Sequence, residues 1–333
     1  MRKKILISGA CGFIGSHLSE SLSRRGEPLI LLDNLSTGTM DNLSWAVPGM
    51  DLDFIETDLH NQSALKKLLQ SCSQVIHLAA VTSVPITVAE PHQTHINNVD
   101  STLNLLEAAR SAGVERFIFA SSAAVYGDCE KSLQTEGTPA NPLSPYAVHK
   151  LTCEYYVRLF SNLYGLPGIC LRLFNVYGPR QPRDELKSGV ISQFCRQMLR
   201  GQAPTIHGDG QQTRDFIHIS DIVEAFVRCL DAPMQTGAGM SFNIASGCSY
   251  SLLEAVECIN SITSQNLKPE FFPSRAGDIL RSKASIELAA STFGFKPRVN
   301  LDDGLRNTLD YEKSISAEPA SITAESIGTA NAP

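Results

Sequence analysis

The segment Ile5-Leu-Ile-Ser-Gly-Ala-Cys-Gly-Phe-Ile-Gly-Ser-His17 constrains the fold more than any other part of this chain. A run of apolar, mostly β-branched residues stops at Gly9, and apolar residues then recur at helical spacing. This pattern predicts a buried strand, a tight turn and the start of a helix. The glycines let the backbone turn sharply and approach a pyrophosphate closely, while free N–H groups at the helix N-terminus attract the phosphates. The segment therefore predicts a dinucleotide site.

A second apolar run, Pro28-Leu-Ile-Leu-Leu32, ends in the acidic residue Asp33. Asp33 lies close to the distance at which a carboxylate accepts hydrogen bonds from an adenosine ribose. A carboxylate there repels a 2′-phosphate, so Asp33 favours NAD over NADP. Asp33 can also cap the turn that follows, and the two roles are compatible. The spacing G-x-x-G-x-x-G departs by one residue from the G-x-G-x-x-G fingerprint, so a purely structural turn is the alternative to a dinucleotide site.

Strand and helix patterns alternate along the chain. Further strands are predicted at 53–58, 74–80, 116–120, 213–219 and 242–245, and helices at 63–69, 97–112, 190–200 and 220–230, the last capped by Ser220. Such alternation predicts a doubly wound parallel α/β (Rossmann) sheet with right-handed crossovers. We expect an NAD-binding Rossmann domain over residues 1–172 and a smaller, partly interleaved α/β substrate domain over 173–312. Residues 313–333 lack apolar periodicity and are predicted to be disordered.

Composition excludes several classes of protein. The net charge is −6 without a sustained basic run, which argues against nucleic acid as the main partner. The nine cysteines contain no C-x-x-C pair and no zinc-like spacing, so they are typical of reduced thiols and predict no metal site. No apolar stretch reaches about 18 residues, and Met1-Arg-Lys-Lys leads directly into the first strand. We therefore expect neither a signal peptide nor a membrane span, and a cytoplasmic location.

A candidate catalytic group follows the strand at 116–120. Ser122 stands just after this strand, and Tyr146 and Lys150 are four residues apart at the start of a predicted helix, so both project from one face. The cations of Lys150 and of an oxidised nicotinamide would lower the pKa of the tyrosine toward working pH. Tyr146 would then act as a general base toward a sugar hydroxyl, with Ser122 hydrogen-bonding the same oxygen. A Y-x-x-x-K pair also occurs by chance on helix surfaces, and the preceding turn and serine are what favour the functional interpretation.

Several motifs in order give the chain a family resemblance. They are Gly9/Gly12/Gly15, His77-Leu-Ala-Ala80, Ser122, Tyr146-x-x-x-Lys150, Leu171-Arg-Leu-Phe-Asn175-Val-Tyr-Gly-Pro-Arg180 and His207-Gly-Asp-Gly-Gln-Gln-Thr-Arg214-Asp-Phe-Ile-His218. Over about residues 4 to 312 the chain resembles the extended short-chain dehydrogenases/reductases, and within them the nucleotide-sugar 4-epimerases. The resemblance implies that Tyr146 removes the proton of the sugar 4-hydroxyl while hydride passes to NAD, that a transient 4-keto sugar turns in the site, and that hydride returns to its other face.

The resemblance also implies binding residues. For the NAD cofactor they are Gly9, Gly12, Phe13, Ile14, Gly15, Asp33, Asn34, Asp58, Leu59, Leu78, Ala79, Ala80, Thr82, Asn98, Tyr146 and Lys150. For the UDP-sugar substrate they are Ser83, Ser122, Tyr146, Asn175, Arg214, Arg275, Asp278 and Ser282. Within the second set, Asn175, Arg214 and Arg275 would bind the phosphates, because arginine bonds phosphate oxygens in pairs. Asp278 would hold the uridine ribose.

Two positions indicate the reaction and the substrate within this family. Related dehydratases and decarboxylases carry an acid beside the catalytic hydroxyl, whereas this chain has Ala123 and Ala124 after Ser122, which favours epimerisation. Ser282 matches the site where a bulky tyrosine restricts the pocket to plain hexoses. A serine leaves room for a 2-acetamido group, so we expect UDP-N-acetylglucosamine and UDP-N-acetylgalactosamine as substrates, with UDP-glucose and UDP-galactose as further candidates.

Alternatives to this assignment stay open at the sequence level. A UDP-glucuronate 4-epimerase differs in only one or two pocket donors near C5. A non-catalytic NAD-binding regulator shares the fold, although such proteins usually lose the tyrosine or lysine. The resemblance further implies a homodimer in which the helices near 97–112 and 147–163 pair across a twofold axis.

Overall fold

A central sheet of seven parallel strands organises the structure, which is a computed structural model that describes residues 2–129, 133–184, 187–274 and 279–317. Its strand order is β11 (Met240–Ile244), β6 (Gly168–Leu173), β5 (Arg116–Ser122), β4 (Cys72–His77), β1 (Lys4–Ser8), β2 (Leu29–Asp33) and β3 (Leu52–Glu56). The order reverses direction between β1 and β4. Ligands of doubly wound sheets bind at this reversal, beyond the carboxyl ends of the strands.

Helices cover both faces of the sheet because alternate strand residues are apolar on each side. Ile5 and Ile7 of β1 pack with α1 (Phe13–Arg24) and α8 (Ile219–Asp231), while Leu6 between them faces the opposite core. That opposite core is formed by α2 (Gln62–Leu69), α5 (Ser101–Ala112) and α6 (Pro145–Tyr164). The two cores fix the register of each strand, since a one-residue slip would exchange the faces.

Short elements lie between the main ones. They are η1 (Met40–Leu43), α3 (Val84–Ala89), α4 (Pro91–His95), the π-helix η2 (Ile96–Asp100) and the 3-10 turn η3 (Ala123–Tyr126). The helical stretch that ends with α5 therefore begins at Pro91, six residues before the position expected from the sequence. Proline at the first helical position explains this earlier start, because its fixed φ favours the first turn of a helix.

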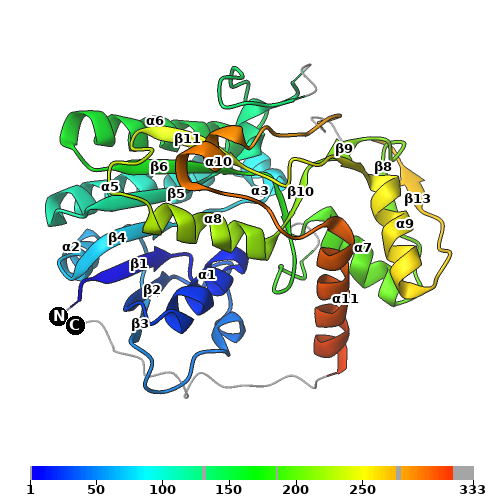
Figure 1. The fold of residues 1–333 in the computed structure, drawn as a ribbon, viewed down its shortest axis with the longest axis horizontal. Coiled ribbons are helices and arrows are strands. Elements are labelled where there is room, and N and C mark those ends of the chain that lie inside the picture. Colours follow the sequence, from blue (N-terminus) through cyan, green and yellow to red (C-terminus); the bar gives the residue numbers. More distant parts are fainter. Residues whose placement is uncertain (1, 130–132, 185–186, 275–278, 318–333) are drawn as a thin grey trace.

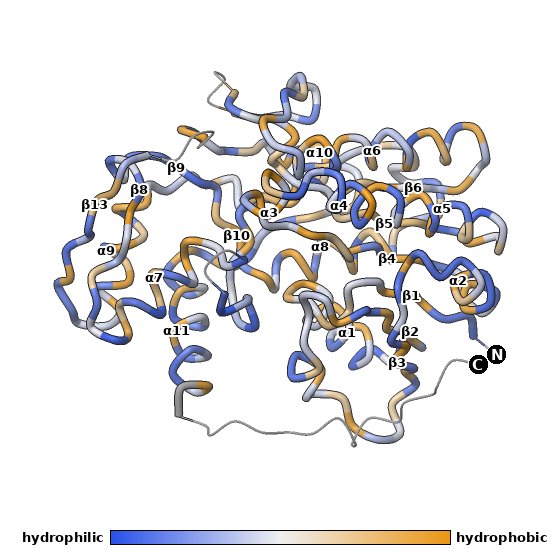
Figure 2. The backbone as a smooth tube through the Cα atoms, turned by 180° about the vertical axis from the view of Figure 1, so that it is seen from behind, coloured by the Kyte–Doolittle hydropathy of each residue, from blue (hydrophilic) through white to orange (hydrophobic). Residues whose placement is uncertain are grey.

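A smaller lobe lies beside the sheet, on the right-hand side of Figure 1. It contains α7 (Val190–Leu199), α9 (Leu252–Thr263), α11 (Leu301–Ala317) and the strand pairs β8 (Thr205–His207) with β13 (Glu270–Phe272) and β9 (Thr213–Arg214) with β12 (Tyr250–Ser251). Phe194, Ile259 and Leu305 belong to its own apolar core. Hydrophobic and hydrophilic residues alternate along α11 in Figure 2, as expected for a helix with one buried side.

The chain crosses between the two parts more than once. The pair β7 (Asn175–Tyr177) and β10 (Phe216–His218) lies at the junction, after which α8 packs on α1 and β11 joins the main sheet beside β6. Helix α10 (Glu287–Phe293) then contacts β11. The order of the elements thus alternates between the two parts, while the two domains with their boundary at 172/173 stay a prediction.

The α/β doubly wound parallel sheet is confirmed, and three local predictions are corrected. The strand expected at 213–219 is divided into β9 and β10, because the Asp215 carboxylate binds Ser246 and Ala284 instead of continuing the strand. The N-cap of α8 is His218, whose ring accepts from the Ser220 N–H, so Ser220 lies inside the helix. Residues 313–317 are helical within α11, contrary to the expected disorder. Within the described ranges, none of the helices has the length and apolarity that a membrane crossing requires.

Candidate active site

The glycine turn after β1 is shaped for close backbone approach. Gly9 has φ +74°, and a Cβ there would lie 2.7 Å from the Ala79 backbone nitrogen, while a Cβ at Gly15 would overlap the Gly9 carbonyl oxygen. Gly12 is the N-cap of α1 and no side chain caps it, so the first N–H groups of the helix stay available to an anion. The backbone itself leaves no room for side chains at Gly9 and Gly15, and the open N–H groups fit the pyrophosphate of a dinucleotide.

Asp33 at the end of β2 closes this turn. Its Oδ2 accepts from the Cys11 N–H at 2.9 Å and its Oδ1 from the Leu35 N–H at 2.9 Å, and Leu35 adopts φ +55°. The capping role of Asp33 is thus present, whereas its bond to a ribose stays a prediction. Burial raises the pKa of Asp33, and its backbone hydrogen bonds oppose that shift. Two other predicted cofactor residues contact each other, because Asn34 Nδ2 donates to Asp58 Oδ2 at 2.7 Å.

One cavity of about 1130 Å³ brings most of the predicted residues together at the carboxyl ends of the strands. Its lining includes Gly9, Gly12, Phe13, Ile14, Gly15, Asp33, Asn34, Asp58, Leu59, Leu78, Ala79, Ala80, Thr82, Ser83, Ser122, Tyr146 and Lys150. Asn98 lies behind the lining, where its side chain accepts from the Val81 N–H at 2.7 Å and donates to the Val81 carbonyl at 3.0 Å. Asn98 therefore holds the segment after β4 in place, and its role in binding NAD stays a prediction.

The catalytic candidates come from β5 and from the first turns of α6. Ser144 caps α6 by accepting from the Ala147 N–H, and Pro145 occupies the first helical position, which fixes where Tyr146 projects. Ser122 is the last residue of β5, where its hydroxyl accepts from the Ala124 N–H at 3.2 Å, and it lies close enough to the Tyr146 phenol to lower the tyrosine pKa against the effect of burial. The strand end and the helix start thus bring the two hydroxyl groups together.

Lys150 lies one turn further along α6, beneath Tyr146. Its Nζ donates to the Ala120 carbonyl at 2.7 Å and is 5.9 Å from the centroid of the Tyr146 ring. Burial lowers the pKa of Lys150 to about 8. Burial also raises the pKa of the Tyr146 phenol, and the hydrogen bond with Ser122 opposes that shift only in part. These protein groups therefore do not lower the pKa of Tyr146 as expected from the sequence. The sequence argument named two cations that would lower it, Lys150 and an oxidised nicotinamide, and only the nicotinamide is left to do so.

The predicted substrate residues lie in different places. Asn175 begins β7 and donates from Nδ2 to the Asp215 carbonyl at 3.2 Å. Arg214 ends β9 and donates to the Thr213 and Ile279 carbonyls. Ser282 is only 5% exposed, and its carbonyl accepts from Ser249. Asn175, Arg214 and Ser282 are outside the lining of the cavity as the structure describes it. Arg275 and Asp278 lie outside the described residues.

Sequence reasoning missed one side of the cavity. Arg180, Arg183 and Lys187 line it from the loop after β7, and Tyr311 and Ile315 line it from α11. Arg180 ends a motif quoted above, and the basic residues after it were a signal that could have been used. Tyr311 and Ile315 gave no such signal, because they reach the cavity only through the packing of α11.

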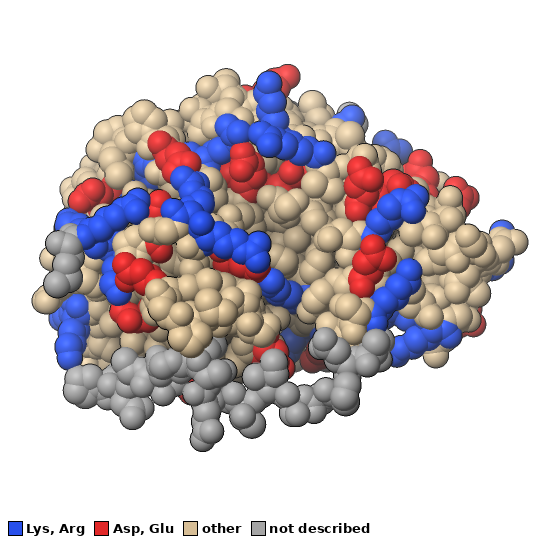
Figure 3. All heavy atoms as spheres, turned by 60° about the horizontal axis from the view of Figure 1, so that its bottom comes forward, with Lys and Arg blue, Asp and Glu red and all other residues tan. Residues whose placement is uncertain are grey.

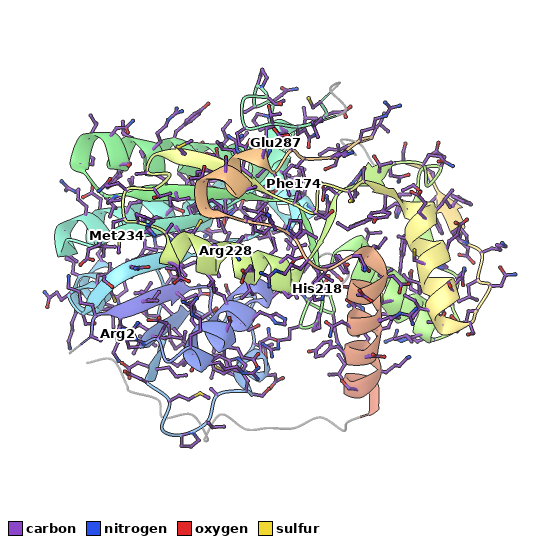
Figure 4. All side chains as sticks on the ribbon, in the orientation of Figure 1. Arg2, Phe174, His218, Arg228, Met234 and Glu287 are labelled. Atoms are coloured by element: carbon purple, nitrogen blue, oxygen red, sulfur yellow. The ribbon has the colours of Figure 1, made fainter. Side chains whose placement is uncertain are left out.

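The junction of the two parts surrounds this side of the cavity. Phe174, which also lines the cavity, and His218 both lie between the sheet and the smaller lobe in Figure 4. On the face shown in Figure 3, basic side chains lie close to acidic ones. An ion pair of Arg180 with Glu20 joins the loop after β7 to α1.

Comparison with known proteins identifies relatives along almost the whole chain. The model of a family described as "NAD dependent epimerase/dehydratase family" matches residues 5–245. A UDP-glucose 4-epimerase of Mycolicibacterium smegmatis is 37% identical over 316 residues, which cover 94% of this chain and 99% of the relative.

Two solved structures are similar to this one to the same degree. A UDP-N-acetylglucosamine 4-epimerase of Methanobrevibacter ruminantium, in complex with UDP-N-acetylmuramic acid, is 35% identical with a TM-score of 0.87. A UDP-glucuronic acid 4-epimerase of Bacillus cereus, in complex with UDP-glucuronic acid and NAD, is 33% identical, also with a TM-score of 0.87. Both comparisons cover 94% of this chain and 99% of the other. Overall similarity therefore does not distinguish among the three sugars.

Proposed function

The chain belongs to the NAD-dependent epimerase/dehydratase family and is an NAD-dependent nucleotide-sugar epimerase, and from this premise we propose that it interconverts UDP-N-acetylglucosamine and UDP-N-acetylgalactosamine. The observation that carries the proposed chemistry is the convergence of Ser122, Tyr146 and Lys150 on the cavity that also holds the glycine turn. NAD, when bound there, accepts a hydride from the sugar and returns it, so that no net oxidation occurs.

The side chains of this protein do the remaining work. Tyr146 takes the proton of the sugar 4-hydroxyl and later returns it, while Ser122 donates a hydrogen bond to the same oxygen. Lys150 is held against Ala120 and places its positive charge beneath the Tyr146 ring. On the cofactor side, the glycine turn and the N-terminus of α1 would hold the pyrophosphate, and Asp33 the adenosine ribose.

The choice of sugar depends on Ser282. Its small side chain follows a segment that the family resemblance assigns to substrate binding, and a tyrosine at this position would add a large ring. We propose that serine leaves space for the 2-acetamido group. Plain UDP-glucose and UDP-galactose would also fit such a pocket, with less contact around C2.

The direct test incubates the purified protein separately with UDP-N-acetylglucosamine, UDP-glucose and UDP-glucuronate and follows the 4-epimer by proton NMR. We expect the acetamido sugar to react fastest. Ser282→Tyr should lower turnover of the acetamido sugar by about tenfold or more and that of UDP-glucose less. Because Ser282 is only 5% exposed, the added ring also overpacks the protein, so denaturant unfolding of the variant is the control for loss of the fold. Equal loss for both sugars would contradict the role given to Ser282.

UDP-glucuronate 4-epimerisation is the second candidate. One observation favours it. The UDP-glucuronic acid 4-epimerase of Bacillus cereus and the UDP-N-acetylglucosamine 4-epimerase of Methanobrevibacter ruminantium have the same TM-score of 0.87 with this chain. Faster turnover of UDP-glucuronate in the same NMR experiment would establish it instead. A non-catalytic regulator is not supported, since Ser122, Tyr146 and Lys150 are all retained in one cavity.

We also propose that the enzyme is a cytoplasmic homodimer that pairs through α5 and α6. Val148, Tyr155 and Leu159 of α6 are between 43% and 52% exposed, which is unusual for apolar side chains on an unpaired helix. Sedimentation velocity tests the dimer, and a monomer at micromolar concentration would contradict it.

A further inference from the structure

Three consecutive residues of β5 contact α6 at three residues spaced four apart. The pairs are Ala120 with Lys150, Ser121 with Glu154, and Ser122 with Tyr146. Residues spaced by four share one face of a helix, so these contacts form a continuous seam. Two of the three pairs contain catalytic candidates. The third, in which Ser121 Oγ donates to Glu154 Oε1 at 2.5 Å, has no role in the mechanism described above.

Glu154 is held by two strands besides β5. Arg172 of β6 bonds it with two parallel hydrogen bonds, Nε to Oε1 at 2.9 Å and Nη2 to Oε2 at 2.7 Å, and both side chains are less than 10% exposed. Ser241 of β11 donates to Oε2 at 3.0 Å. Each carboxylate oxygen of Glu154 thus accepts two hydrogen bonds, and the planar guanidinium of Arg172 holds the carboxylate in one orientation.

Such a pair is better explained by geometry than by stability. Burying two charges costs desolvation energy, and well-packed apolar residues of the same volume are often at least as stabilising. A bidentate ion pair whose hydrogen bonds are all satisfied instead fixes the relative position of the secondary-structure elements on which its two residues lie. Here these elements are α6, which carries Tyr146 and Lys150, and β6, and the same carboxylate also accepts from Ser121 of β5, the strand that ends in Ser122.

We propose that Glu154, held by Arg172, is a positioning residue for the epimerase reaction: through Ser121 it fixes the end of β5 against α6, so that Ser122 and Tyr146 meet the same substrate oxygen. Glu154 does not line the cavity and touches no reacting group, whereas Ser121 lines it beside Ser122. The inference rests on the proposed function, because the alignment matters only if these two hydroxyl groups act together.

Glu154 also acts on Lys150 through its charge. The carboxylate lies one helical turn beyond Lys150 and raises the lysine pKa, as do Cys153 of α6 and Cys170 of β6, against the larger lowering that burial causes. A neutral residue at 154 would leave Arg172 as an unbalanced positive charge nearby. Lys150 would then lose its proton at a lower pH, and a purely structural role of Glu154 predicts no such change.

A matched pair of variants tests the positioning role, since Ser121 and Ser241 each donate one hydroxyl hydrogen bond to Glu154 from different strands. Ser121→Ala should lower kcat by about tenfold with KM unchanged, because small displacements of reacting groups are costly. Ser241→Ala should leave kcat within about twofold, although one hydrogen bond of similar strength is lost. Equal effects of the two variants on kcat would overturn the proposal.

The pH dependence of kcat in Glu154→Gln supplies a second readout. We expect the alkaline limb of the profile to move to lower pH, in line with the loss of the Lys150 charge, while bound NAD is retained. A lower kcat with an unmoved limb would overturn the electrostatic part and leave the positioning part to the comparison of Ser121→Ala with Ser241→Ala. Failure of the proposed function would be seen first, in the NMR assay of the wild-type enzyme, which would then turn over none of the three UDP sugars. That result would overturn this inference as well.

Discussion

The side of this molecule that we propose to hold the cofactor and the side that we propose to hold the substrate are built in different ways. On the cofactor side, the glycine turn, Asp33 and the segment after β4 follow directly from strands of one sheet, and their polar groups bond backbone within the same layer. On the substrate side, Asn175 and Arg214 stand on strands of two or three residues. The carboxylate of Asp215 there joins the loop at Ser246 to the segment at Ala284.

The difference matches what each ligand requires. A cofactor that is regenerated in every cycle can be held by a rigid backbone cradle, because it does not have to leave. A substrate whose sugar turns within the site needs firm contacts at the nucleotide and freedom at the reacting ring. Contacts supplied by side chains on separate segments allow this division.

Tyr146, where the two regions meet, should give the largest effect. Tyr146→Phe removes the group that takes the proton and should lower turnover by about 10³-fold, while NAD stays bound because the cradle is unchanged. Turnover by NMR and NAD content of the denatured protein measure the two properties. Tyr155→Phe, on the exposed side of the same helix, is the control and should behave as wild type. Joint loss of NAD and activity in Tyr146→Phe would show that the regions are not separable.

The cofactor cradle should tolerate almost no added volume. In Gly15→Ala the new methyl group would overlap the Gly9 carbonyl, so we expect a loss of about 3 kcal/mol in the free energy of unfolding, together with loss of bound NAD. Gly137→Ala is the matched control, because its methyl group would meet only the Thr135 hydroxyl at 3.8 Å. Denaturant unfolding and NAD content measure both variants. Normal NAD content in Gly15→Ala would show that the turn is less rigid than its geometry indicates.

The same contrast explains how much could be predicted from sequence. Strand, turn and helix signals around Gly9 and Asp33 are contiguous, so local patterns were enough to place them and to predict the sheet. The seam between β5 and α6 was partly predictable, since Tyr146 and Lys150 share a helical face. Glu154 shares that face as well, but its partner Arg172 is on another strand and gave no local signal.

The substrate side depends on long-range packing. Nothing near Tyr311 indicates that α11 lines the cavity, and the division of the strand at 213–219 depends on where Asp215 finds its partners. The cap of α8 illustrates the same limit, because both His218 and Ser220 are chemically suitable and only the fold selects the histidine. Where elements end is decided by contacts that a single sequence does not display.

Asp215 offers the smallest and most specific test of the comparison. Its carboxylate accepts from Ser246 N and Oγ, Gly247 N and Ala284 N, and its carbonyl accepts from Asn175. Burial raises the pKa of Asp215 to about 6 despite these bonds. Protonation removes acceptor capacity from the segments beside Asn175, so KM for the UDP sugar should rise by about fivefold from pH 7.5 to pH 5, the worth of one hydrogen bond, with bound NAD unchanged.

The sign of the stability change separates this effect from unfolding. Because the folded pKa lies above the unfolded value of 3.8, the folded protein binds a proton between about pH 6 and pH 4 that the unfolded chain does not. Through this group, acidification over that interval stabilises the fold, so a rising KM there reflects local loosening. Asp215→Asn, which presents N–H groups to the same donors, should show the raised KM at pH 7.5 and little further change on acidification. If its KM still rose on acidification as in the wild type, another group would be responsible, and the substrate side would not depend on Asp215 as the cofactor side depends on its glycines.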